Sequence, residues 1–392
     1  MYHLLDPFYN GILAGIIALW LLGFRPPIAT KVAAALKKRR NLVTIAVWAI
    51  FFLFAAAYVL NFGYFEDIHD IDDAVDAGYH SLKNGINPYK EDVIPRFKEK
   101  YSTHPEFANG TYNYMPLDLL VYYTAGSLTS SLGKPLWFVL TNLIFAGAAF
   151  YILQRLLKVR WTSYLPAAGI VMLFYSFDNA SLTLLLMISS LYARERLESR
   201  SELVSILLMG LATLTKVYAA IPFAIMLLFD IESKARSRDW RKMTEPLGAA
   251  VISAVVAVAV MVPFGFSSVL NSAVLFHASA GSRVGTASGG TLLSELTANS
   301  QYFAVMSLAM VLIAVLISFR FRNLNDRVLL VIAVFLLVSA KSSLAPLTVA
   351  GLFLVMRLRD RALAKKAKEK ADLEKGHLDS SPALSGLQSD PR

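Results

Sequence analysis

Runs of apolar residues long enough to cross a bilayer constrain this chain more than any other feature. The segments NLVTIAVWAIFFLFAAAYVLNF (41–62) and LGAAVISAVVAVAVMVPFGF (247–266) each reach the ~20 residues that a membrane-spanning helix needs. Of the 392 residues, 56% are hydrophobic and 17% are charged, whereas soluble domains carry about 25% charged residues. The sequence therefore predicts an all-α polytopic membrane protein, embedded in membrane lipids.

Twelve apolar segments predict a bundle of about 10–12 membrane helices. They are 9–24, 42–62, 114–131, 135–155, 163–177, 179–193, 202–215, 217–230, 247–264, 301–319, 328–340 and 344–356.

Basic residues are unevenly distributed between these segments. Lys and Arg gather in 25–40, 154–160, 194–200, 234–242, 320–327 and the tail from Arg357, which together hold 29 of the 38 basic residues. Short basic loops stay in the cytoplasm, so the loops 63–113 and 265–300 are expected on the opposite, outward face. This distribution also explains the net charge of +10, and no nucleic-acid partner is expected. The chain has no cysteine, which excludes disulfides and thiolate metal sites.

Two pairs of short segments begin and end on the cytoplasmic side, with Lys216 at one turn and Lys341 at the other. We interpret them as tilted hairpins that reach an outward cavity. The segment 114–131 is not expected to span the membrane fully. Residues 1–360 would form the membrane domain, and residues 361–392 a basic, then disordered, cytoplasmic tail. The short loops and the lack of cysteine favour a prokaryotic plasma membrane over the endoplasmic reticulum.

The outward loop 63–113 is too long for a simple connection and carries ten acidic and five basic residues. Its first half predicts a helix over 74–83, with Asp72 or Asp73 as the N-cap and Gly85 as the terminator. Asp70 and Asp72 would precede this helix, and Asn87-Pro88-Tyr89 would form an extended segment or a turn. Such a loop is expected to be a large, partly helical outward element.

Two interpretations of the aspartates stay open. They are solvated loop charges with one N-cap, or one of them is a general base at a pocket near the membrane surface. A carboxylate there can take a proton from a sugar hydroxyl, and partial burial brings its pKa nearer to the working pH.

Three motifs occur in order: Asp70-Ile71-Asp72, then Gly85 with Asn87-Pro88-Tyr89, then TYNYMPL (111–117) at the start of the next apolar segment. This order resembles the first lumenal loop of GT-C glycosyltransferases. The resemblance extends to the catalytic subunit of GPI mannosyltransferase I and to the polyprenol-phosphate-mannose-dependent mannosyltransferases of actinobacteria and archaea, including those of the phosphatidylinositol-mannoside type. The similarity is dense over about fifty residues, and the rest of the chain agrees in layout.

The resemblance implies a GT-C-type bundle with an outward active site and a polyprenyl-phosphate sugar donor. Asp72 matches the catalytic aspartate best, Asp70 matches the first acid of the D-x-D motif, and Asp73 is the alternative. It also implies inversion at C1, so that a β-linked donor such as polyprenyl-phosphate-mannose gives an α-linked product. The acceptor would be a glycolipid or a lipid-linked glycan.

Such a reaction requires cations near the outward face to stabilise the departing phosphate. Lys216 and Lys341 are costly at their depth and are expected to face a cavity or partner, although snorkelling to the headgroups is the alternative. His277 and Arg283 lie on a Gly/Ser-rich outward loop, where Arg can bind phosphate through two hydrogen bonds. A solvated surface histidine is the competing interpretation of His277.

Tyr89, Tyr112 and Tyr114 are candidates to stack on sugars, or alternatively to anchor the chain at the membrane interface. Asp178 and Asn179 are placed on the acceptor side by the topology alone.

His69, His80 and His104 share the loop with the acids, a set of residues that can hold a divalent ion, although free loop histidines are the favoured interpretation. No metal or other cofactor is expected, because a monophosphate donor has no diphosphate that requires one.

Two other functions remain. A transporter or flippase for a glycolipid or anionic substrate would use the intramembrane lysines to carry its substrate or protons. A non-catalytic membrane subunit would tolerate Asp→Asn changes in the loop. The sugar itself is not identified by the residues, since arabinose or glucose donors suit the same scaffold.

Overall fold

The computed structural model describes residues 70–93, 111–132, 136–157, 179–197, 201–275, 303–338 and 344–379. Within these ranges the regular structure is helical throughout. The α-helices are α5 (Asp70–Lys83), α7 (Pro116–Thr129), α8 (Leu136–Leu157), α10 (Ala180–Arg196), α11 (Ser201–Thr213), α12 (Ala220–Arg236), α13 (Thr244–Met261), α14 (Phe266–Val269), α18 (Phe303–Ser318), α19 (Leu324–Val338) and α20 (Leu344–Asp379). The all-α fold class is confirmed.

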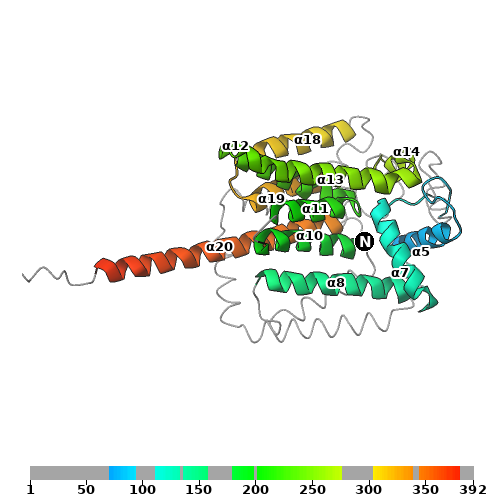
Figure 1. Cartoon of the computed structure of the whole chain (residues 1–392), viewed down its shortest axis with the longest axis horizontal. Helices are drawn as coiled ribbons and strands as arrows, with labels where there is room; N and C mark the ends of the chain where they lie inside the picture. Colours follow the sequence, from blue (N-terminus) through cyan, green and yellow to red (C-terminus); the bar gives the residue numbers. More distant parts are fainter. Residues whose placement is uncertain are drawn as a thin grey trace, which may run out of the picture.

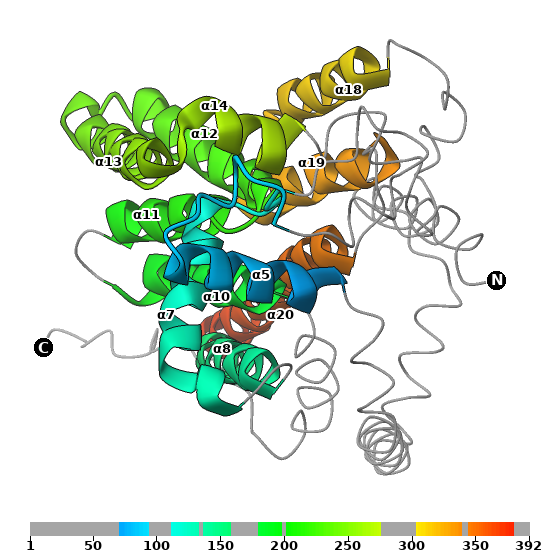
Figure 2. The same ribbon diagram turned by 90° about the vertical axis from the view of Figure 1, so that its right-hand side faces the viewer.

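Every predicted apolar segment that falls in the described residues coincides with a helix. The segments 9–24, 42–62 and 163–177 lie outside the described residues. The long helices run nearly parallel along the long axis of the molecule, whereas α5 and α7 lie at one end of them (Figure 1). Viewed from that end, α5 crosses in front of α10 (Figure 2).

Among the described residues, two helical stretches are long and apolar enough to cross a membrane, Leu136–Leu157 and Trp240–Phe264. The second combines α13 with the turns of 3₁₀-helix on either side of it. Its valines at 251, 255, 258 and 262 recur every three or four residues and are 51–62% exposed. A stripe of this kind is unfavourable in water but is the face that a helix presents to lipid, so α13 lies at the periphery of a membrane bundle.

Helix α7 is too short to span a bilayer. Its 14 residues extend about 21 Å, against about 30 Å for the hydrocarbon core. This agrees with the prediction that the segment 114–131 does not span fully. The hairpin around Lys216 is also present, as α11, a 3₁₀ turn (Val217–Ala219) and α12.

Charged side chains tie the helices together at the end opposite α5. The Arg194 guanidinium donates to both carboxylate oxygens of Asp230, which is 2% exposed. Other ion pairs at this end join consecutive helices, as in Lys234–Glu202 (2.9 Å) and Arg357–Asp326 (2.7 Å), or helices distant in sequence, as in Arg327–Glu232. Basic clusters within the described residues therefore meet at one end, as their common assignment to one side of the membrane predicts.

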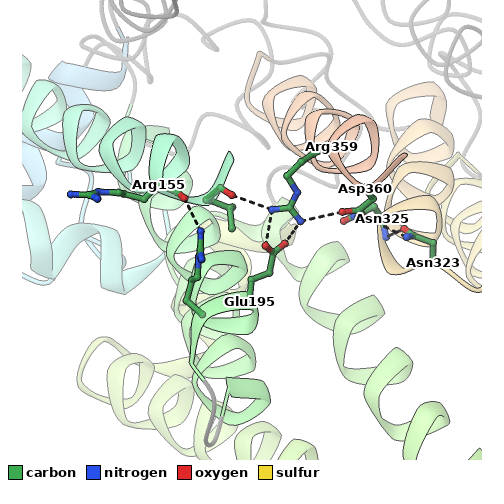
Figure 3. A network of polar contacts seen from close by, with 8 residues as sticks. Arg155, Glu195, Asn323, Asn325, Arg359 and Asp360 are labelled. Atoms are coloured by element: carbon green, nitrogen blue, oxygen red, sulfur yellow. Dashed lines mark hydrogen bonds and ion pairs between the residues drawn. The ribbon is translucent and has the colours of Figure 1, made fainter. Parts of the chain in front are cut away.

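Arg359 of α20 is the centre of this charged end (Figure 3). It donates to both oxygens of Glu195, to Asp360 (3.1 Å) and to the backbone carbonyl of Leu156 (3.3 Å), which lies in the last turn of α8. Carbonyls in the last turn of a helix have no intrahelical partner, and a cation also suits the negative end of the helix dipole. Asp360 in turn accepts from Asn325 of α19 (2.8 Å).

Helix α5 begins earlier than expected. The prediction that Asp72 or Asp73 caps a helix over 74–83, with Asp70 before it, is wrong, because α5 starts at Asp70. Acidic residues in a first turn are stabilised by the positive helix N-terminus, which favours this earlier start. The predicted C-terminus is confirmed: Gly85 has φ +73°, and Ile86 N–H donates to Ser81 C=O (2.8 Å) in a Schellman motif.

Two helix pairs approach each other closely at a glycine. A Cβ atom on Gly126 of α7 would lie 2.7 Å from the Tyr79 ring of α5, and one on Gly210 of α11 would lie 2.5 Å from Ser253 Oγ of α13. Small residues allow helices to approach closely where lipid provides no hydrophobic driving force.

We expect Gly210→Ala to destabilise the protein by about 1–3 kcal/mol, because the added methyl group separates α11 from α13. Gly248→Ala is the matched control, since nothing lies within 4 Å of a Cβ atom there and the change raises helix propensity by about 1 kcal/mol. Thermal unfolding of the detergent-solubilised variants measures both. A Gly210→Ala protein as stable as the Gly248→Ala protein would contradict the packing described.

Candidate active site at the α5 end

The loop after α5 folds back onto the bundle through Asn87. Its side-chain Oδ1 accepts from Tyr89 N–H (3.0 Å), and its Nδ2 donates to the carbonyl of Phe264 (2.9 Å), just after α13. The carbonyl of Pro88 accepts from Tyr112 N–H (2.7 Å). The predicted turn at Asn87-Pro88-Tyr89 is thus present, and it connects the loop to two other segments.

Three tyrosines form the centre of this end. The Tyr112 ring lies 5.6 Å from the Tyr89 ring and 5.6 Å from the Tyr114 ring, edge to face in both cases. Tyr89 O–H donates to the backbone carbonyl of Tyr114 (2.7 Å). Tyr89 and Tyr112 are buried and Tyr114 is half-buried, so the two buried tyrosines form the packed support on which Tyr114 rests. Their predicted stacking on a sugar stays a prediction.

The structure adds Asp118, which the sequence analysis missed. This residue lies in the first turn of α7 and is fully buried. Its Oδ2 accepts from Tyr112 O–H (2.9 Å) and from Asn179 Nδ2 (2.8 Å). The signal was available, because an acidic residue inside an apolar segment is expensive and usually functional.

Burial and the Asp118 carboxylate both act on the neighbouring phenols. Burial, followed by repulsion from Asp118, raises the pKa of Tyr112 and of Tyr89 well above the ordinary value. Both tyrosines therefore stay protonated and remain hydrogen-bond donors over the whole physiological pH range.

Lys216 lies against the same tyrosine cluster from another helix pair. Its ammonium nitrogen is 4.0 Å from the centroid of the Tyr114 ring, a cation–π contact. The turn that carries it is attached to α7 by a backbone hydrogen bond from Leu117 N–H to Leu214 C=O (3.2 Å). In the same turn, the hydroxyl of Thr215 lies 2.8 Å from the hydroxyl of Thr183 on α10. Lys216 is thus fixed at the α5 end and half-buried.

A line of buried polar groups continues along α10. Asn179 and Ser181 are both fully buried. Ser181 O–H donates to Asn142 Oδ1 of α8 (2.6 Å), which also accepts from Tyr122 O–H of α7. Asn179 is the N-cap residue of α10, but its side chain does not cap that helix and reaches Asp118 instead.

The predicted site residues divide into those that the structure places and those that it does not. Asp70, Asp72 and Asp73 form the first turn of α5. The structure brings Tyr89, Tyr112, Tyr114, Asn179 and Lys216 together at the end of the bundle that α5 crosses. His277, Arg283, Lys341 and Asp178 lie outside the described residues.

Of the three histidines in the acidic loop, the described residues include only His80. It is exposed, and its Nε2 lies 3.7 Å from Asp76 Oδ1 on the same helix. No group of three or more potential ligands is found in the described part of the chain.

We expect Asn87→Ala to release the turn after α5, since it removes both side-chain hydrogen bonds of this partly buried residue. The free energy of unfolding should fall by about 1–3 kcal/mol, and the variant should show faster protease cleavage in 84–93 and lower activity. Asn84→Ala is the control, because Asn84 is exposed at the end of the same helix. Limited proteolysis of membranes, read by mass spectrometry, compares the two; equal cleavage rates would contradict the role of Asn87.

The comparisons with known proteins assign a family. A model of glycosyltransferase family 87 matches residues 112–345, which include Tyr112, Asp118, Asn179 and Lys216. No curated protein and no solved structure matches the chain. The matched region is more than half of the 392 residues. The chain therefore belongs to glycosyltransferase family 87, whose members are membrane-associated transferases of sugars.

Proposed function

We propose that this glycosyltransferase moves mannose from a polyprenyl-phosphate donor to a glycolipid or lipid-linked glycan acceptor, with inversion to an α-mannosidic bond. The observation that carries the proposal is the position of Lys216, held over Tyr114 at the end of the bundle that α5 and its aspartates cross. An acidic element and a fixed cation at one end match the requirements of a displacement at phosphate-linked C1.

The proposed site is extracytoplasmic, in a multi-pass protein of a prokaryotic plasma membrane. Support comes from the opposite end, where Arg194, Arg327, Arg357 and Arg359 form ion pairs. Basic residues that flank membrane helices concentrate on the cytoplasmic side. The α5 end then faces outward, where lipid-linked donors present their sugars.

The reaction is a single displacement. A carboxylate of α5 removes the proton from the acceptor hydroxyl, whose oxygen attacks C1 of the sugar. The bond from C1 to the phosphate oxygen breaks, and polyprenyl phosphate leaves with both electrons of that bond. Lys216 stabilises the negative charge that develops on the leaving phosphate. Lys341, His277 and Arg283 complete the proposed phosphate contacts.

The identity of the base is proposed among Asp70, Asp72 and Asp73. The resemblance favours Asp72. The helical register of α5 instead favours Asp70, which precedes the buried Ala74 and Gly78 by one and two turns.

No metal ion is required by this scheme, because a monophosphate leaving group can be stabilised by the cationic side chains alone.

We expect one of Asp70→Asn, Asp72→Asn and Asp73→Asn to lower transfer by about 10²–10⁴-fold, the contribution of a positioned general base. Glu91→Gln is the control, an exposed acid in the loop after α5. Membranes supplied with polyprenyl-phosphate-linked tritiated mannose report the rate. Mass spectrometry of lipids from a deletion strain identifies the acceptor from the truncated glycan.

The transfer assay and a vesicle-uptake measurement together separate the proposed transferase from the alternative functions. Parental rates in all three aspartate variants would exclude α5 as the source of the base. Vesicle uptake of labelled substrate without a new glycosidic bond would instead identify a transporter or flippase.

A further inference from the structure

Asp118 is the least expected buried group at the α5 end. It is fully buried, and it accepts hydrogen bonds from two neutral donors, Tyr112 O–H and Asn179 Nδ2. Withdrawing a carboxylate from water costs several kcal/mol, so a protein retains one inside only where the surroundings compensate.

The surroundings of Asp118 compensate through two helix N-termini. Asp118 itself lies in the first turn of α7, and Asn179 is the N-cap residue of α10. Each N-terminus carries a partial positive charge that stabilises an anion within the first turn. The carboxylate therefore has a defined place between α7 and α10, and its position fixes the orientation of Tyr112.

Tyr112 connects the Asp118 carboxylate to the two parts of the proposed site, helix α5 with its aspartates and Lys216 with the Tyr114 ring. On one side, its ring carbon Cε2 lies 2.8 Å from the position of a Cβ atom on Gly78, so the ring directly contacts the backbone of α5. On the other side, the ring is edge to face with Tyr114, over which the Lys216 ammonium lies at 4.0 Å. A change in the angle of the Tyr112 ring would displace the Tyr114 ring beneath Lys216.

We infer that Asp118 is a positioning residue for donor binding: through Tyr112 it holds the Tyr114 ring that supports the Lys216 ammonium, and it does not itself touch the substrate. This inference rests on the proposed function, in which Lys216 binds the donor phosphate. Asp118 thereby determines affinity for a lipid monophosphate while lying inside the bundle.

A purely structural role for Asp118 is the alternative, and α7 provides a matched comparison. Tyr122, one turn further along the same helix, is also fully buried and donates to the buried Asn142. Tyr122→Phe removes a buried hydrogen bond of similar cost, but that bond lies outside the chain of contacts from Asp118 to Lys216.

The test measures binding of a short-chain prenyl monophosphate to the purified full-length protein in detergent, together with the KM for the donor. We expect Asp118→Asn and Tyr112→Phe each to weaken binding and raise the donor KM about tenfold, the equivalent of about 1.4 kcal/mol. The KM for the acceptor should stay within twofold. The double variant should lose little more than either single one, because both act on the same interaction.

Tyr122→Phe should lower the unfolding temperature as much as Asp118→Asn does and leave prenyl-phosphate affinity unchanged. Wild-type affinity in a folded Asp118→Asn protein would overturn the inference and leave the proposed function intact. An equal loss of affinity in Tyr122→Phe would also overturn it, by showing a general effect of stability. No saturable binding by the wild-type protein would overturn the proposed donor, and the inference with it.

Discussion

Lipid permits a helix bundle to carry charges only at its two ends, or inside it where they are paired, and the described structure follows from this constraint. At one end, arginines from α10, α19 and α20 meet the acids of neighbouring helices, with Asp230 almost completely buried against Arg194. At the other end lie the aspartates of α5, and Lys216 is held on an aromatic ring. The ion pairs of the first end join the helices, and the proposed site lies at the other end.

Between these ends, one group of buried polar side chains lies in the half near α5. Thr183, Ser181 and Asn142 are fully or almost fully buried, and each has a hydrogen-bond partner on another helix or, for Thr183, in the turn after α11. Such bonds fix the register of α7, α8 and α10 against one another, since a shift along the axis would leave buried groups unsatisfied. That register determines where Asp118 and Lys216 stand relative to α5.

The sequence predicted the helices well and their ends poorly. Apolar content located the hairpin around Lys216, but it ended the next helix at 230, whereas α12 continues to Arg236. Beyond the apolar region a helix is stabilised by capping and ion pairs, such as that of Lys234 with Glu202, which hydropathy does not detect. The early start of α5 at Asp70 has the same origin in local electrostatics. Asp118 stands out in the sequence as an acid inside an apolar segment, but its contacts with Tyr112 and with Asn179, 61 residues away, are visible only in the structure.

The contact geometry also explains why the base and the cation of the proposed site need not share a helix. Helix α5 rests on Tyr112 through Gly78, where a Cβ atom would clash with the ring, and Lys216 rests on the adjacent Tyr114 ring. Helix α5 and Lys216 are therefore both positioned by the same pair of packed tyrosine rings. Packed aromatic rings have few alternative arrangements, so the distance between α5 and Lys216 is kept within narrow limits by the two rings between them. A transferase that must hold a hydroxyl and a phosphate on opposite sides of one carbon atom depends on that separation more than on either group alone.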